Sequence, residues 1–252
     1  MMRPTSRLAT RGLHCIAAAV CIVAAVAGCS GRAQAAGAAY QVDTAEVSEP
    51  GSCKVESWAS SASNRDIIAS VSPACVIDVG RPVEFSAQFS RTRADGEWGS
   101  SASPKVKTNI VPTAIGSWGF AISAIASYDL LTKENTAVLV NIPATLRVSN
   151  VVRINLNAGW LLDRTTNLNY FIYGAGFDWR TPDNIWTLTG EVFGQAGFAE
   201  DPGVIRPRFQ LGLRYRPVDQ FNIDLIYGRN LAGERANWIT LATVIRFTPQ
   251  EK

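Results

Sequence analysis

The clearest pattern in the chain is an alternation of apolar and polar side chains near its C-terminal end. In the stretch 208–215, Phe209, Leu211, Leu213 and Tyr215 alternate with arginine, glutamine and glycine. The same period of two recurs in 221–228 and again in 239–247. Because successive side chains of a strand point to opposite faces, the pattern predicts three strands, each apolar on one face.

Similar segments, separated by turn signals, fill the chain from Cys53 onward. Long strands with one apolar face are typical of barrels that turn that face to lipid. We therefore predict an all-β fold, a transmembrane antiparallel up-and-down β-barrel of about 12 strands, with 10 as the alternative count. A soluble sandwich or lipocalin-like barrel is the other fold considered, and it would expose faces bearing arginine and asparagine to water. The expected strands are 53–62, 66–76, 82–92, 100–111, 118–129, 137–147, 151–162, 168–179, 185–196, 206–216, 221–231 and 237–247.

The connections alternate between tight turns and charged or glycine-rich segments. The turns at 78–81, 148–151, 180–184 and 216–220 are tight, whereas 93–99 and 197–205 are expected to be longer. Bacterial barrels have short periplasmic turns and longer outer loops, so the tight turns and both chain ends are expected in the periplasm. Aromatic residues of the lipid-facing parity fall at two levels, as expected at membrane interfaces: Trp118, Trp179, Trp186, Tyr215 and Phe247 near the periplasmic ends, and Tyr128, Trp160 and Tyr227 near the outer ends.

The first residues resemble an export signal rather than part of the fold. Arginines at positions 3, 7 and 11 precede a short apolar run from Cys15 to Gly28, and Ala33-Gln34-Ala35 offers a cleavage site. This is the organisation of a secretory signal peptide over 1–35, followed by a flexible leader over 36–51 and the barrel over 52–252. The sequence Val26-Ala27-Gly28-Cys29 also resembles a lipobox, so lipidation at Cys29 is an alternative.

Removal of residues 1–35 changes the charge and the available chemistry. It removes four of the 24 basic residues and no acid, which leaves 20 basic against 21 acidic side chains. Nucleic-acid binding then lacks an electrostatic basis. The single histidine, His14, is removed as well, so Ser–His catalysis is excluded. We expect no enzymatic activity, no catalytic residues, no cofactor and no metal.

Two cysteines, Cys53 and Cys75, remain in the mature chain. Exported proteins fold in an oxidising compartment, which favours a disulfide over two free thiols. A hairpin centred on Asn64 would place the two residues directly opposite each other, within the range that a disulfide can bridge. We therefore expect them to be bonded to each other.

The polar parity of the strands carries charges that would face the interior of a barrel. Arg153 and Asp178 lie opposite each other in one expected hairpin, and Arg214 and Asp224 nearly so in another. Such pairs either fill and rigidify the lumen or form a constriction that filters solutes by charge. The lumen-lining candidates are Glu84, Arg147, Arg153, Asp178, Glu191, Arg208, Arg214 and Asp224.

The segments 190–195, 207–215 and 223–230, together with the closing strand to Phe247, resemble bacterial outer-membrane barrel proteins of the porin and transporter type. Within that type they are similar to the group labelled as the meta-pathway of phenol degradation. The resemblance covers roughly 118–247 and contains no motif diagnostic of a substrate. Such barrels usually end on the terminal aromatic that the assembly machinery reads, whereas here five residues follow Phe247.

These observations predict a cell outer-membrane protein, a narrow porin or transporter for small solutes. Its expected partners are outer-membrane lipid, small solutes and the outer-membrane assembly machinery. Twelve strands imply a pore narrower than that of the large porins. A non-conducting surface barrel that binds partners through its outer loops is the alternative, and a soluble periplasmic lipid-binding barrel is a third.

Overall fold

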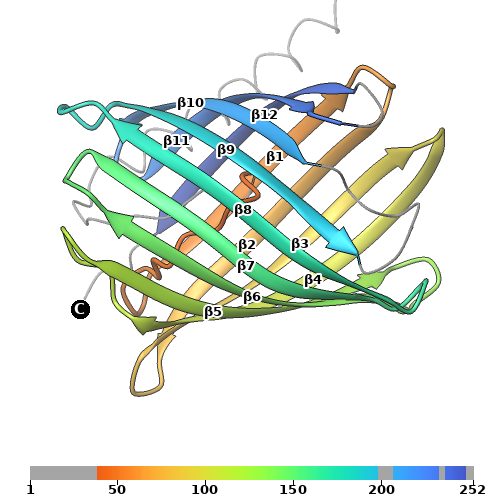
Figure 1. Ribbon diagram of the computed structural model, residues 1–252, viewed down its shortest axis with the longest axis horizontal. Coiled ribbons are helices and arrows are strands. Elements are labelled where there is room, and N and C mark those ends of the chain that lie inside the picture. Colours follow the sequence, from red (N-terminus) through yellow and green to blue (C-terminus); the bar gives the residue numbers. More distant parts are fainter. Residues whose placement is uncertain (1–38, 198–206, 233–235, 248–252) are drawn as a thin grey trace, which may run out of the picture. The chain divides into compact units, whose positions relative to one another are not determined.

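A computed structural model describes residues 39–197, 207–232 and 236–247. Within these residues the chain forms twelve antiparallel strands, each paired with the next, and β1 pairs with β12 to close the barrel (Figure 1). The predicted all-β barrel and its strand count are confirmed. The strands are β1 (Cys53–Ala62), β2 (Ile67–Asp78), β3 (Pro82–Ala94), β4 (Glu97–Val111), β5 (Trp118–Asp129), β6 (Asn135–Arg147), β7 (Val152–Asp163), β8 (Leu168–Arg180), β9 (Trp186–Gly197), β10 (Arg208–Val218), β11 (Phe221–Asn230) and β12 (Asn237–Phe247).

The alternation of the sequence becomes an inside and an outside of the barrel. Leu225 is 55 % exposed on the outer surface, whereas its neighbour Asp224 is fully buried in the interior. The outer surface is broadly apolar, with exposed Phe85, Phe89 and Leu213. Large apolar side chains are left exposed in this way when lipid rather than water covers them.

The two ends of the barrel can be named by the elements that lie there. Cys53 of β1 and Phe247 of β12 are paired at one end, here called the terminal end, and the β1–β2 turn lies at the other, here called the hairpin end. The expected aromatic residues lie exposed at both levels, and the rings of Trp186 and Tyr215 are 4.7 Å apart at the terminal end.

The β3–β4 connection differs from its expectation as a longer loop over 93–99. Both strands extend beyond their predicted ends, and only Asp95 and Gly96 connect them. These residues have φ angles of 51° and 86°, which is what a two-residue hairpin turn that follows the strand twist requires. The other expected long loop, 197–205, lies outside the described residues from 198 onward.

The first hairpin has the predicted register. Cys53 lies opposite Cys75, and a disulfide joins them with their Cα atoms 4.0 Å apart. The strands therefore carry a covalent link at the terminal end.

Candidate functional site

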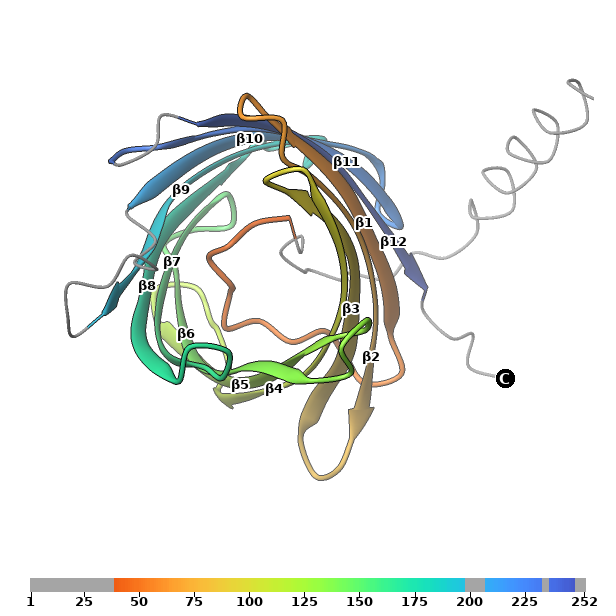
Figure 2. The same ribbon diagram turned by 90° about the vertical axis from the view of Figure 1, so that its right-hand side faces the viewer.

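The most informative part of the site is a segment that was expected to lie outside the barrel. Residues 39–52, here called the luminal segment, run inside the ring of strands (Figure 2). Tyr40, Val42, Thr44 and Ala45 are buried, and Ala45 has no exposed surface. From the sequence, 36–51 is predicted to be a flexible leader. From residue 39 onward the segment is instead held by inward-facing side chains, because its backbone groups find partners there.

Side chains from three strands accept hydrogen bonds from the backbone of the luminal segment. The carboxylate of Glu191 in β9 accepts from the N–H groups of Gln41 and Val42, at 3.0 and 3.3 Å. Asn157 in β7 accepts from the N–H of residue 43 at 2.9 Å, and Thr145 in β6 accepts from the N–H of residue 45 at 2.8 Å. The segment therefore has a defined path through the lumen.

Two acidic side chains of the segment bind cationic groups on the wall. The carboxylate of Asp43 lies 2.5 Å from Lys105 Nζ and 2.8 Å from Lys107 Nζ, both in β4. Burial alone would raise the pKa of Asp43, but the two ammonium groups outweigh it and hold that pKa below its ordinary range. Glu46 pairs with Arg153 of β7 and, at 3.3 Å, with Arg147 of β6.

Glycines on the inward parity make room for the first part of the segment. A Cβ atom on Gly212 of β10 would collide with the hydroxyl of Tyr40, and one on Gly174 of β8 would lie 2.8 Å from Val42 Cγ2. The hydroxyl of Tyr40 donates to Asp224 at 3.3 Å, and the guanidinium of Arg214 lies 5.6 Å from the ring centroid. The absence of side chains at these strand positions thus allows close approach.

The eight predicted inward-facing residues form two groups, one beside the luminal segment and one at an open cavity. Both predicted pairs are present, Arg153 Nη2 with Asp178 Oδ2 at 2.7 Å and Arg214 Nε with Asp224 Oδ1 at 2.6 Å. Most of the eight contact the luminal segment directly or through such a pair: Arg147, Arg153, Asp178, Glu191, Arg214 and Asp224. Glu84 and Arg208 instead line an open cavity.

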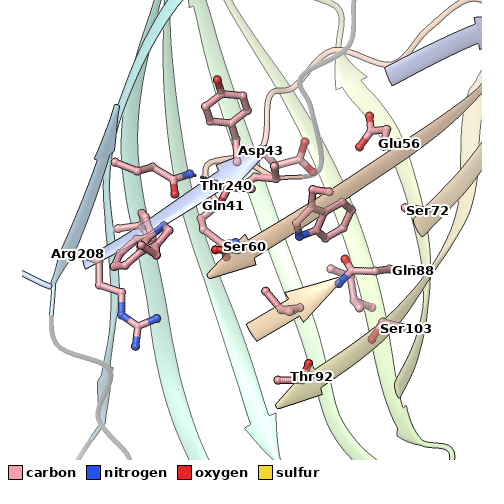
Figure 3. A pocket seen from close by; sticks show the side chains of 18 of the residues that line it. Gln41, Asp43, Glu56, Ser60, Ser72, Gln88, Thr92, Ser103, Arg208 and Thr240 are labelled. Carbon is pink, nitrogen blue, oxygen red and sulfur yellow. Dashed lines mark hydrogen bonds between the residues drawn. The ribbon is translucent and has the colours of Figure 1, made fainter. Parts of the chain in front are cut away.

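This cavity has a volume of about 710 Å³ and is shown in Figure 3. The luminal segment forms one boundary through Tyr40, Gln41 and Asp43, and the cavity extends toward the hairpin end, where Asn64 and Asn230 line it. A second pocket, beside Cys53 at the terminal end, measures only about 10 Å³. The cavity also reaches toward the terminal end along β1 to β3, where Lys54, Ala74 and Glu84 line it.

The site residues predicted from the sequence do not include Tyr40, Asp43 or Glu46, nor the two lysines that bind Asp43. Lys105 and Lys107 have the inward parity in the sequence, so their direction could be predicted although their partner could not. A further signal is the inward-facing glycines, which leave space that another part of the chain must fill.

Among the described residues, no group of three or more histidine, cysteine, aspartate or glutamate side chains is arranged to hold a metal ion. The described residues contain no helix that is long and apolar enough to cross a membrane.

A closed barrel with an apolar outer surface and a polar, hollow interior has the architecture of outer-membrane porins and channels. The chain belongs to the family described as "Uncharacterised conserved protein UCP029691", whose model matches residues 23–247. No curated protein matches the chain.

Solved structures with a similar fold include two porins and an outer-membrane channel. The KdgM porin in complex with disordered oligogalacturonate is 11 % identical, with 77 % of this chain and 99 % of that chain covered and a TM-score of 0.55. The NanC porin is 6 % identical, with 76 % and 98 % covered and a TM-score of 0.59. An outer-membrane channel from Pseudomonas putida F1 is 11 % identical, with 80 % and 97 % covered and a TM-score of 0.59. At these identities the likeness establishes the fold.

Proposed function

We propose that this protein is an outer-membrane channel for small polar solutes, and that the luminal segment narrows its pore. The observation that carries the proposal is the cavity of about 710 Å³ inside a barrel whose interior bears hydroxyl, amide and ionic groups. A barrel that served only as a membrane support would not need an open, hydrated volume of this size, because side chains can fill a small barrel completely.

The direction of the pore follows from the connections. Two-residue turns occur at both ends, 219–220 at the terminal end and 95–96 at the hairpin end, but the longest connection in sequence, 198–207, joins β9 to β10 at the hairpin end. Because bacterial barrels have short periplasmic turns and longer outer loops, this assigns the terminal end to the periplasm. The cavity would then face the cell exterior and receive solutes from it. The luminal segment would form the barrier between the cavity and the periplasm.

The contacts of the luminal segment also favour a second candidate, a barrel that does not conduct. The segment crosses the lumen and is held by Glu191, by Asn157 and by the ion pairs of Asp43 and Glu46. If these contacts never open, solutes could enter the cavity but could not cross the membrane. The two candidates differ in flux and not in fold.

Solute flux into liposomes separates them. The full chain, exported and purified from the outer membrane of a Gram-negative host, would be reconstituted and tested with neutral solutes of increasing size. A channel predicts swelling with the smaller solutes and a size limit below that of the large porins. Absence of swelling, in liposomes shown to contain folded barrel, would support the non-conducting candidate instead.

A further inference from the structure

The cavity has two chemically different walls. Strands β5, β6, β8 and β9 contribute the apolar side chains Ile125, Leu139, Ile172 and Phe193. The opposite strands, β12 and β1 to β4, contribute small hydroxyl and amide side chains, several of which are labelled in Figure 3: Ser60, Ser72, Gln88, Thr92, Ser103 and Thr240. The division is one of emphasis, since the amides of Asn141 and Gln195 lie on the first wall and Ile67 and Ile68 on the second. A solute that fills this space therefore meets both apolar surfaces and hydrogen-bonding groups.

Several polar groups of the second wall are free to bind a solute. The hydroxyls of Ser60, Ser72 and Thr240 form no hydrogen bond with another residue in the part of the chain that the structure describes. Polar groups in a ligand site that are left without protein partners are matched by water or by the ligand.

The charges around the cavity are balanced. Lys54 lies 3.0 Å from Glu56 and 3.4 Å from Glu84, and Asp43 binds the lysines at 105 and 107. With Asp66 and Arg208, which also line the cavity, and Lys107, which binds Asp43 from beside it, the charges amount to four cations and four carboxylates. The site therefore offers no net charge that would favour a cationic or an anionic solute.

Two tryptophans complete the lining. Trp58 of β1 packs against the buried cluster that contains Tyr40, and the guanidinium of Arg208 lies 5.9 Å from the ring centroid of Trp238 in β12. Both line the cavity. Indole rings fixed in this way provide flat apolar surfaces within a polar wall.

From these features we infer that the cavity binds an uncharged polyhydroxylated solute, specifically a short neutral oligosaccharide. A sugar ring has apolar C–H faces that fit the aliphatic and aromatic surfaces and a rim of hydroxyl groups that fits the serine, threonine and amide wall. A volume of about 710 Å³ has room for more than one ring. The inference rests on the proposed channel function, for which it names the class of solute.

Calorimetric titration of the detergent-solubilised full chain tests the solute class. The probes are two neutral trisaccharides, maltotriose and cellotriose, with trigalacturonate as the anionic and the glucosamine trimer as the cationic comparison. We expect at least one neutral trisaccharide to bind about tenfold more tightly than either charged one. Tighter binding of a charged trimer, or no binding of either neutral one, would overturn the inference.

Two variants locate the binding to the cavity. Gln88→Leu keeps the side-chain size and removes the amide, and we expect it to weaken binding of the neutral trisaccharide about fivefold. Trp58→Leu removes an indole face and should weaken it about tenfold. Trp160→Leu is the matched control, because Trp160 is exposed on the outer surface. Equal affinities in the Gln88 variant, the Trp160 control and the wild type would contradict the assignment, even if Trp58→Leu failed to fold.

Bilayer recordings of the same samples distinguish the two proposals. A current that the neutral trisaccharide reduces supports both the channel function and the solute class. A current that the trisaccharide does not reduce, together with no calorimetric binding, contradicts the solute class and leaves the channel function. Binding without current supports the solute class and removes the channel.

Discussion

At the scale of single residues, the role of a side chain depends on a partner that sequence parity does not reveal. Glu191 has the inward parity in the sequence, and in the structure it is 5 % exposed. From the sequence alone, a carboxylate at that position is equally compatible with a selectivity filter. In the structure its oxygens accept hydrogen bonds from Gln41 and Val42, about 150 positions away in the chain. A contact of such sequence separation leaves no periodic signal.

Glu191→Gln tests this role. A carboxylate can accept with both oxygens, whereas an amide replaces one acceptor with a donor that would face an N–H group. We expect the barrel to fold and the luminal segment to be held less firmly, so that single-channel conductance rises. Glu84→Gln is the matched control, because Glu84 binds Lys54 and has no hydrogen bond or ion pair with the luminal segment. Equal conductance of the Glu191 variant and the Glu84 control would argue against the anchoring role.

At the scale of elements, the strands could be predicted and the luminal segment could not. Each strand carries its own period of two, and the hairpin registers follow from it, as Arg153 opposite Asp178 illustrates. The Asp95–Gly96 turn was predictable from turn chemistry, although the sequence analysis assigned it to a longer loop. The luminal segment is not a strand, and side chains from many strands determine its position. Only the inward-facing glycines, such as Gly212, mark the space that it occupies.

The inside and outside of β3 can be tested with neighbouring substitutions. Phe89 is 46 % exposed on the outer surface, and Gln88 lines the cavity. Phe89→Arg places a charge in lipid and should cost roughly 2–4 kcal/mol near mid-depth. Gln88→Arg should cost much less, because its charge enters a hydrated volume. Urea titration of the refolded barrels in lipid vesicles measures both, and similar losses would contradict the assignment of faces.

The disulfide belongs to the first hairpin, which is rich in serine and poor in large apolar side chains. Cys53 and Cys75 are 22 positions apart. A cross-link over a loop of that order stabilises a protein by roughly 3 kcal/mol in the entropic model. The Cys53→Ser/Cys75→Ser double variant should therefore unfold at lower urea concentration than the oxidised wild type. Two reactive thiols in the denatured, unreduced wild type would show that the bond does not form.

At the scale of the whole molecule, a barrel with an apolar outer surface and a polar interior encloses a cavity, and the luminal segment bounds that cavity on one side. Removing the contacts that hold the luminal segment should change conduction without changing the barrel. Asp43 and Glu46 together bind four cationic side chains of the wall. Breaking a buried ion pair from one side costs about 3–5 kcal/mol, because the remaining charge loses its partner.

The measurement that tests the account most directly is single-channel recording of the wild type beside the Asp43→Asn/Glu46→Gln double variant. We expect small or infrequent openings in the wild type. In the variant we expect a severalfold larger conductance and a shift of the reversal potential toward anion selectivity, because Lys105 and Lys107 then lack the carboxylate of Asp43. If both proteins are folded and neither conducts, the barrel is not a channel limited by its luminal segment.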